Sequence, residues 1–181
     1  MYKVGDHVIY GGVGVCLVSD ITTCDIAGID KDDLYYVLKP VYQDSCTIYA
    51  QTNEKVFMRA VVSKEEADRL IDLIPSMQVE AYHSHVTNEL EQHYKKSINS
   101  HELLELIELT MSTYAKKQEA LELKKKFGAV DERFMKQAED LLFSELAVVY
   151  GIPKESVHAY IDKRINGEAQ ELQEVQEELG K

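Results

Sequence analysis

The first pattern that could do chemistry is the glycine-rich run Gly11-Gly12-Val13-Gly14. A phosphate-binding loop needs a lysine followed by serine or threonine after such glycines, and it needs a helix to begin there. Neither feature follows the run, which is flanked by β-branched and aromatic residues. The sequence therefore predicts a tight turn between two strands at this point.

Four histidines lie close together in the sequence, at positions 83, 85, 93 and 101. Imidazole nitrogen is a common ligand for zinc and related metals. Helix positions two residues apart point in different directions, however, and neither an HExxH pattern nor a pair of cysteines completes a ligand shell. These histidines are expected on the surface or half-buried, and no metal site is predicted.

The three cysteines, Cys16, Cys24 and Cys46, include no CxxC pair and are odd in number. They indicate neither a disulfide framework nor a zinc knuckle. Asp25 follows Cys24, and an acidic neighbour raises a thiol pKa, so a reactive cysteine is not expected. No nucleophile with an adjacent base is recognisable either, and we predict a protein that is not an enzyme and needs no cofactor.

The formal net charge of −12 disfavours a protein that binds DNA through its whole surface. Lysines nevertheless cluster at positions 95–96, 116–117 and 124–126, and such clusters can contact phosphates without reading a base sequence. No segment has the apolar length of a membrane-spanning helix, and the first residues lack the layout of a signal peptide. We therefore expect a cytoplasmic protein with no membrane partner.

The elements that must position these residues change in type near residue 61. Before it, short apolar runs separated by Gly5-Asp6, Gly11-Gly12 and Asp44-Ser45 predict a five-stranded barrel, because short strands must hide their edges. The strands are expected at His7–Tyr10, Val13–Thr22, Leu34–Pro40, Thr47–Ala50 and Val56–Arg59. After it, Ser63 and Glu66 form a capping box that starts an all-α region.

About five helices are expected in the second half of the chain. The first runs from Lys64 to Ile74 and ends at Pro75, and the last is a short helix that starts at Pro153. The others are expected at Ser84–Lys96, from Glu102 to about Phe127 with Gly128 as its C-terminal cap, and at Asp131–Tyr150 with Gly151 closing it. The third helix is expected to bury Leu103, Ile107, Met111, Tyr114 and Leu121. Residues 166–181, with five glutamates, are expected to form an acidic tail.

Several segments resemble the RNA-polymerase-interacting domain shared by CarD-type (CarD/CdnL-like) transcription regulators and the transcription-repair coupling factor. They are residues 2–10, 35–40, 47–49 and 53–56 in the barrel. In the helical half, residues 132–135, Ala138, Leu141-Leu142 and 145–147 are similar to the closing helix of that family. The resemblance spans roughly residues 1–150, and its strength lies in the order of the segments.

The resemblance implies an α+β protein in three parts. Residues 1–61 would form a Tudor-like or SH3-like barrel that binds the RNA polymerase β subunit, residues 62–165 a helical domain close to promoter DNA, and residues 166–181 the tail. The result would be an altered stability of the open promoter complex. Family members often carry a tryptophan that falls near Val86 in this chain, which has no tryptophan at all.

Two sets of contact residues follow. The polymerase contacts are expected at Cys24, Asp25, Thr47 and Tyr49, with Tyr49 as the aromatic anchor. The DNA contacts are expected at Val86, Lys95, Lys96, Lys116, Lys117, Lys124 and Lys125. Two alternatives stay open at this point: a polymerase-bound adaptor whose acidic helical domain recruits a protein, and an unrelated SH3-like scaffold that binds peptides. The sequence does not indicate the oligomeric state.

Overall fold

The computed structural model describes residues 1–23, 33–43, 46–52 and 56–167. It divides the chain into two compact units, with the boundary between Val61 and Val62. The periodicity of the sequence changes at the same place, because Ser63 caps the first helix: its Oγ accepts a hydrogen bond of 3.1 Å from the Glu66 amide. The predicted combination of a small β-domain and an all-α domain is confirmed.

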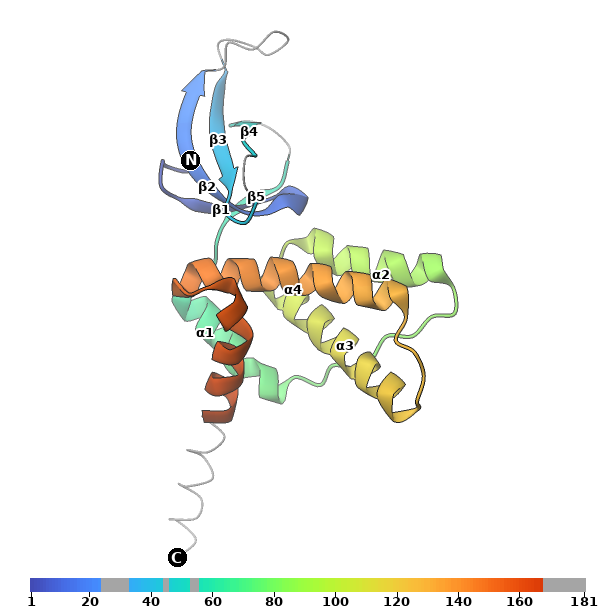
Figure 1. Cartoon of the computed structure of the whole chain (residues 1–181). Coiled ribbons are helices and arrows are strands. Elements are labelled where there is room, and N and C mark those ends of the chain that lie inside the picture. The colour runs from blue at the N-terminus through green and yellow to red at the C-terminus, as the bar shows by residue number, and fades with distance from the viewer. Residues whose placement is uncertain (24–32, 44–45, 53–55, 168–181) are drawn as a thin grey trace, which may run out of the picture. The chain divides into compact units, whose positions relative to one another are not determined.

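The N-terminal unit is one antiparallel sheet of five strands within the described residues (Figure 1). The strands are β1 (His7–Tyr10), β2 (Gly14–Thr23), β3 (Leu34–Pro40), β4 (Ile48–Gln51) and β5 (Met58–Ala60). They lie in the order β4-β3-β2-β1-β5, so β4 and β5 are the two edges. The fold is of the predicted SH3-like type, although the ladder among the described residues does not close between β4 and β5. The glycine-rich run forms the 3-10 turn η1 (Gly11–Val13) between β1 and β2.

The core of this unit lies on one face of the sheet. Its buried members are Val8, Cys16, Val18, Tyr36, Leu38 and Ala50. Burial raises the pKa of the Cys16 thiol to about 11, as expected of a cysteine that serves packing. The N-terminus is tied to two strands: the Tyr2 amide donates to the Tyr36 hydroxyl, and the Tyr2 hydroxyl donates to the Met58 carbonyl, each over 3.1 Å.

The C-terminal unit is helical, and its element bounds are as follows. They are α1 (Lys64–Leu73), the 3-10 turn η2 (Ile74–Ser76), α2 (Thr87–Ser100), α3 (Leu103–Glu122), α4 (Ala129–Tyr150) and η3 (Lys154–Ser156). Residues 157–167 form a further helix. The prediction of about five helices is thus confirmed. The predicted glycine cap also holds at the end of α4, where Gly151 adopts φ 63°.

Helix α4 is the central element of the helical unit, because it contacts α1, α2 and α3 (Figure 1). The side chains packed between these helices include Leu70, Leu90, Leu106, Phe134 and Leu146, all buried. Tyr94 on α2 is completely buried in the same cluster. The helical unit therefore has its own continuous core.

The predicted end of the third helix is wrong. Helix α3 stops at Glu122, and Lys124 adopts the left-handed conformation with φ 52°. The Lys125 amide then donates to the Ala120 carbonyl over 2.8 Å, the long bond of a Schellman turn. Gly128 is the N-cap of α4 instead of a C-terminal cap. Leu121 lies in the last turn of α3 but is 62% exposed, so it does not join the buried face predicted for it.

The Lys124→Gly variant should raise the free energy of unfolding of the helical unit by about 0.5–1 kcal/mol. A side chain in the left-handed region is strained, whereas glycine adopts it readily, and this gain exceeds the entropy that glycine loses on folding. Urea titration followed by circular dichroism at 222 nm measures the change. Lys125→Gly is the control, because the Lys125 φ angle is not positive, and this variant should lose stability. Equal losses in both variants would contradict the strained turn.

Candidate polymerase and nucleic-acid interfaces

The edge strand β4 presents one aromatic side chain to solvent. Ile48 and Ala50 point into the core, while Tyr49, which pairs with Val37 on β3, stands on the opposite face and is 44% exposed. Thr47 immediately precedes the strand and is exposed. An edge strand offers unpaired backbone amides and carbonyls, and an aromatic side chain beside it can anchor a partner.

Two exposed side chains that sequence reasoning missed lie in the segment leading to β4. Val41 and Tyr42 follow β3 and are 38% and 43% exposed. The signal was present in the sequence, since both are large apolar residues directly after Pro40 in a stretch of turn-forming residues. The Val41 amide donates to the Val15 carbonyl on β2 over 3.0 Å, so these two exposed side chains follow the end of β3. Cys24 and Asp25, the other predicted polymerase contacts, lie outside the described residues.

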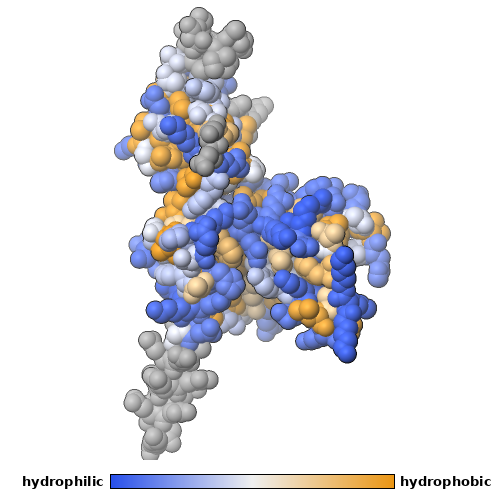
Figure 2. Space-filling model, in the orientation of Figure 1, coloured by the Kyte–Doolittle hydropathy of each residue, from blue (hydrophilic) through white to orange (hydrophobic). Residues whose placement is uncertain are grey.

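A second surface surrounds the end of α3 and the turn into α4, residues 121–128, which we call the basic turn. It carries Lys124, Lys125 and Lys126 beside Leu121 and Leu123, and all five side chains are exposed. Figure 2 shows hydrophobic and hydrophilic residues side by side at this corner of the helical unit. Basic and apolar side chains together suit a partner that offers both phosphates and apolar surface.

The basic turn borders a hollow of about 330 Å³, and the opposite wall is the segment that leads into α2. That wall includes His83 and His85, and the next residue, Val86, is 52% exposed at the N-cap of α2. His83 Nε2 lies 2.8 Å from Glu119 Oε2. The structure thus places Val86 close to the hollow whose other wall includes Lys125.

Lys116 also lines this hollow, but its ammonium group already forms an ion pair inside the protein. Its Nζ lies 2.8 Å from Asp131 Oδ1, and the two side chains are only 13% and 8% exposed. The Tyr94 hydroxyl donates to the same oxygen over 2.7 Å. Burial and the hydrogen bond to Asp131 raise the pKa of Tyr94 far above its usual value, so the phenol stays protonated. Lys116 therefore stabilises the fold at the start of α4.

The other predicted DNA contacts lie elsewhere on the helical unit. Lys95 pairs with Glu91 at 3.1 Å on α2, and Lys96 lines a different hollow of the unit. Lys117 lies half-buried over the Tyr114 ring, with its Nζ 6.0 Å from the ring centroid. The structure groups Lys124 and Lys125 with Lys126, which sequence reasoning had noted in a lysine run without assigning it a contact.

Neither metal chemistry nor membrane insertion gains support from the described part of the chain. Among those residues no group of three or more histidine, cysteine or acidic side chains could hold a metal ion. Every helix described there is too short or too polar to cross a membrane. The histidines near residue 83 instead line a surface hollow, as half-buried or exposed histidines.

Within the described residues, β4 is an edge strand of a small SH3-like domain, and a helical domain follows in the chain. Comparison with known families then identifies the first part: residues 2–62 match the model of the CarD-like/TRCF RID domain. The N-terminal unit belongs to this family of RNA-polymerase-interacting domains, as the sequence resemblance predicted. The protein is therefore transcription-related. The match ends at Val62, so it does not include the helical unit.

Proposed function

We propose that the protein is a bacterial transcription regulator that binds the β subunit of RNA polymerase through strand β4 and acts in the cytoplasm without enzymatic chemistry. The observation that carries this proposal is the match of residues 2–62 to a polymerase-interacting family. The exposed Tyr49 on an edge strand supports the choice of surface, because an added strand from a partner would pair with the backbone while Tyr49 fills a pocket.

The helical unit is proposed to contact promoter DNA through the basic turn and thereby to change the stability of the open complex. The protein has a net charge of −12, so three exposed lysines in one turn are a local exception. Lys124 keeps a strained backbone conformation where glycine would be easier, and strain of this kind often marks a functional position. Tethering by the N-terminal unit raises the local concentration of the turn near DNA, so weak contacts suffice.

Binding of the full chain to the isolated polymerase subunits tests the first part. Fluorescence anisotropy with labelled protein should show saturable binding to the β subunit and none to the α subunit. Binding to core polymerase without binding to β would overturn the choice of subunit. No binding to any of them would overturn the polymerase role and favour the peptide-binding scaffold.

Replacing Lys125 and Lys126 by glutamine should weaken salt-dependent binding of the protein to a polymerase and fork-junction DNA complex. Each phosphate contact contributes a slope of about −0.9 to the dependence of log K on log salt, so the slope should become less negative by about 2. Lys64→Gln with Lys163→Gln is the charge-matched control, because both lysines are exposed and lie far from the basic turn in the sequence. This control should retain the original slope.

One alternative has a specific observation behind it, namely the acidic character of the molecule. If the helical unit recruits a protein instead of DNA, both double variants will leave the salt slope unchanged. Binding to polymerase would persist in that case. The same experiment therefore separates a DNA-contacting regulator from a polymerase-bound adaptor.

A further inference from the structure

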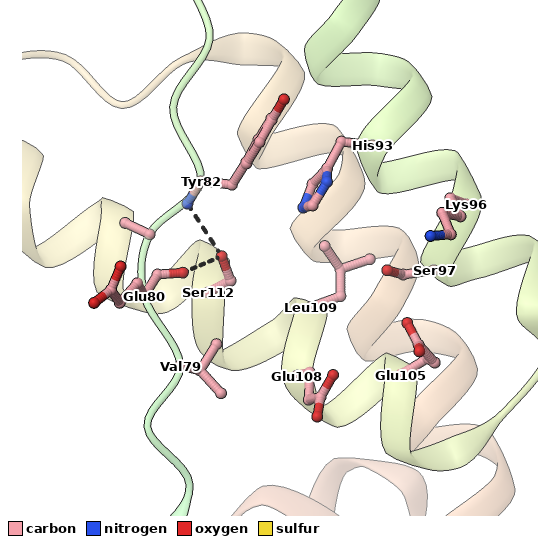
Figure 3. Close-up of a pocket in the computed structure, with 11 residues that line it drawn as sticks. Val79, Glu80, Tyr82, His93, Lys96, Ser97, Glu105, Glu108, Leu109 and Ser112 are labelled. Atoms are coloured by element: carbon pink, nitrogen blue, oxygen red, sulfur yellow. Dashed lines mark hydrogen bonds between the residues drawn. The ribbon is translucent and has the colours of Figure 1, made fainter.

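A second hollow of the helical unit, which the proposed DNA contact does not use, has the features of a small-molecule site. It has a volume of about 380 Å³, within the usual range of ligand pockets. Three segments line it: residues 79–82, one face of α2, and one face of α3. Figure 3 shows the polar ends of Lys96, Ser97, Glu105 and Glu108 around Leu109, which is 3% exposed.

The wall formed by residues 79–82 is held in place by specific contacts. Ser112 Oγ donates to the Glu80 carbonyl over 2.8 Å and accepts from the Tyr82 amide over 3.3 Å (Figure 3). The Tyr82 ring stacks on His93, with centroids 3.7 Å apart and planes 13° from parallel. An extended segment fixed at its backbone and by an aromatic stack gives a largely preformed wall, which lowers the cost of ordering a site around a ligand.

Three charged side chains that face this hollow, Lys96, Glu105 and Glu108, form no ion pair within the described part of the chain. In contrast, Lys95 on the same helix as Lys96 pairs with Glu91. Burial and the nearby Lys96 lower the pKa of His93, so this imidazole is neutral at pH 7 and offers one donor and one acceptor. The lining therefore has one lysine and three glutamates. Figure 3 shows that the Glu80 carboxylate points away from Leu109, whereas Glu105 and Glu108 lie beside it.

The charged side chains of this hollow indicate which chemical groups a ligand would carry. Glu105 and Glu108 are three residues apart on α3, so their carboxylates lie on the same face and can both approach one guanidinium or ammonium group. Lys96, beside the Ser97 hydroxyl, calls for an anionic group on the same ligand. The arginine side chain of a partner protein would leave Lys96 unpaired, whereas a free basic amino acid carries both charges and a net charge of +1. That positive charge complements the net negative charge of a lining with one lysine and three glutamates.

We propose that this hollow binds a free basic amino acid of the arginine type, with its cationic side chain on Glu105 and Glu108 and its carboxylate on Lys96 and Ser97. The Tyr82–His93 stack closes one end of the site. The site is independent of the polymerase and DNA contacts proposed above, since it uses none of the residues of β4 or of the basic turn. Binding there would make the helical unit responsive to a small metabolite.

Titration of the full chain with L-arginine, followed by amide NMR and calorimetry, tests the proposal. Shifts should concentrate at residues 82, 93, 97 and 108, with saturation at or below about 10 mM. Agmatine, which lacks the carboxylate, and L-citrulline, which lacks the side-chain charge, should each bind about fivefold or more weakly. Absence of shifts at these positions, or equal binding of agmatine, would overturn the proposal.

Variants of the residues that line the hollow provide a second test of L-arginine binding. Lys96→Gln and Glu108→Gln should each weaken L-arginine binding about fivefold, because each removes one charged contact in a half-exposed site. Lys95→Gln is the matched control, since this neighbouring lysine is paired with Glu91 and does not line the hollow; it should bind as the unaltered protein does. The amide spectrum reports whether each variant is folded. Unchanged binding in both pocket variants would place any arginine effect outside this hollow.

Discussion

The Asp131→Ala variant should lose about 3–5 kcal/mol of the free energy of unfolding of the helical unit. Asp131 is 5% exposed, and one of its oxygens accepts from both Lys116 Nζ and the Tyr94 hydroxyl, at 2.8 Å and 2.7 Å. Removing the carboxylate takes away the charged partner of the nearly buried Lys116 ammonium and the acceptor of the completely buried Tyr94 hydroxyl. The ammonium keeps a contact of 3.4 Å to that neutral hydroxyl. The loss of buried partners costs more than the pair itself contributes.

The position of Asp131 on α4 adds to this effect. It lies in the first turn of the helix, where a negative side chain interacts favourably with the helix dipole. Its carboxylate also occupies the space beside Gly128: a Cβ added there would lie 2.4 Å from Asp131 Oδ2. The carboxylate is therefore confined by Gly128, Lys116 and Tyr94 together.

Urea unfolding followed at 222 nm measures the loss, because the helices lie in the C-terminal unit. Tyr94→Phe is the control that removes only the hydroxyl, and it should cost about 1 kcal/mol. Combining Asp131→Ala with Lys116→Met should cost less than the sum of the two single changes, since the uncompensated ammonium is gone. A loss below about 1 kcal/mol for Asp131→Ala would show that Lys116 escapes to solvent, and Lys116 would then be available to DNA.

The bounds of two strands could be predicted to the residue. For β1 and β3 the predicted and observed ranges agree, at His7–Tyr10 and Leu34–Pro40. Dense β-branched and aromatic runs with turn formers or a proline beside them leave little freedom there. Strand β5 begins two residues later than predicted, at Met58, because its extent is set by pairing with β1, from Tyr10 to Val8. Pairing partners far apart in the chain are not visible in a local pattern.

The end of α3 illustrates a different limit. Lysine and leucine are good helix formers, so residues 121–126 carry no local stop signal, and Gly128 was the nearest residue that could end a helix. The structure instead ends α3 at Glu122, and Lys124 then adopts a left-handed conformation that lysine seldom adopts. Local sequence preference is overridden here, and the basic turn exists for that reason.

The sequence identifies individual candidate residues, but it does not show which of them come together in the folded protein. The lysines were recognisable from their type, whereas the partner of Lys116 is Asp131 on another helix, and Tyr94 joins them from a third. The hollow lined by His93 and Glu105 also combines three segments. Periodicity shows which face of a helix is buried; which faces meet depends on the packing of the whole unit.

The Tyr49→Ala variant should weaken binding to the polymerase β subunit by about 30-fold or more, which corresponds to about 2 kcal/mol or more for an aromatic anchor. Backbone pairing at an edge strand gives affinity that many sequences could share, so a side chain beside the edge must supply much of the selectivity. Tyr49 is suited to this role because it is 44% exposed and stands on the face of β4 opposite the core. Removing it should leave the fold intact.

Anisotropy titrations against the β subunit measure this effect, with Tyr42→Ala as the matched control. Tyr42 has nearly the same exposed fraction, 43%, but lies in the turn after β3 and not on the edge strand. A smaller loss, below about threefold, is expected for the control because side chains at the rim of an interface contribute little. If Tyr42→Ala weakens binding more than Tyr49→Ala does, the polymerase contacts the β3–β4 connection, and strand addition at β4 is wrong.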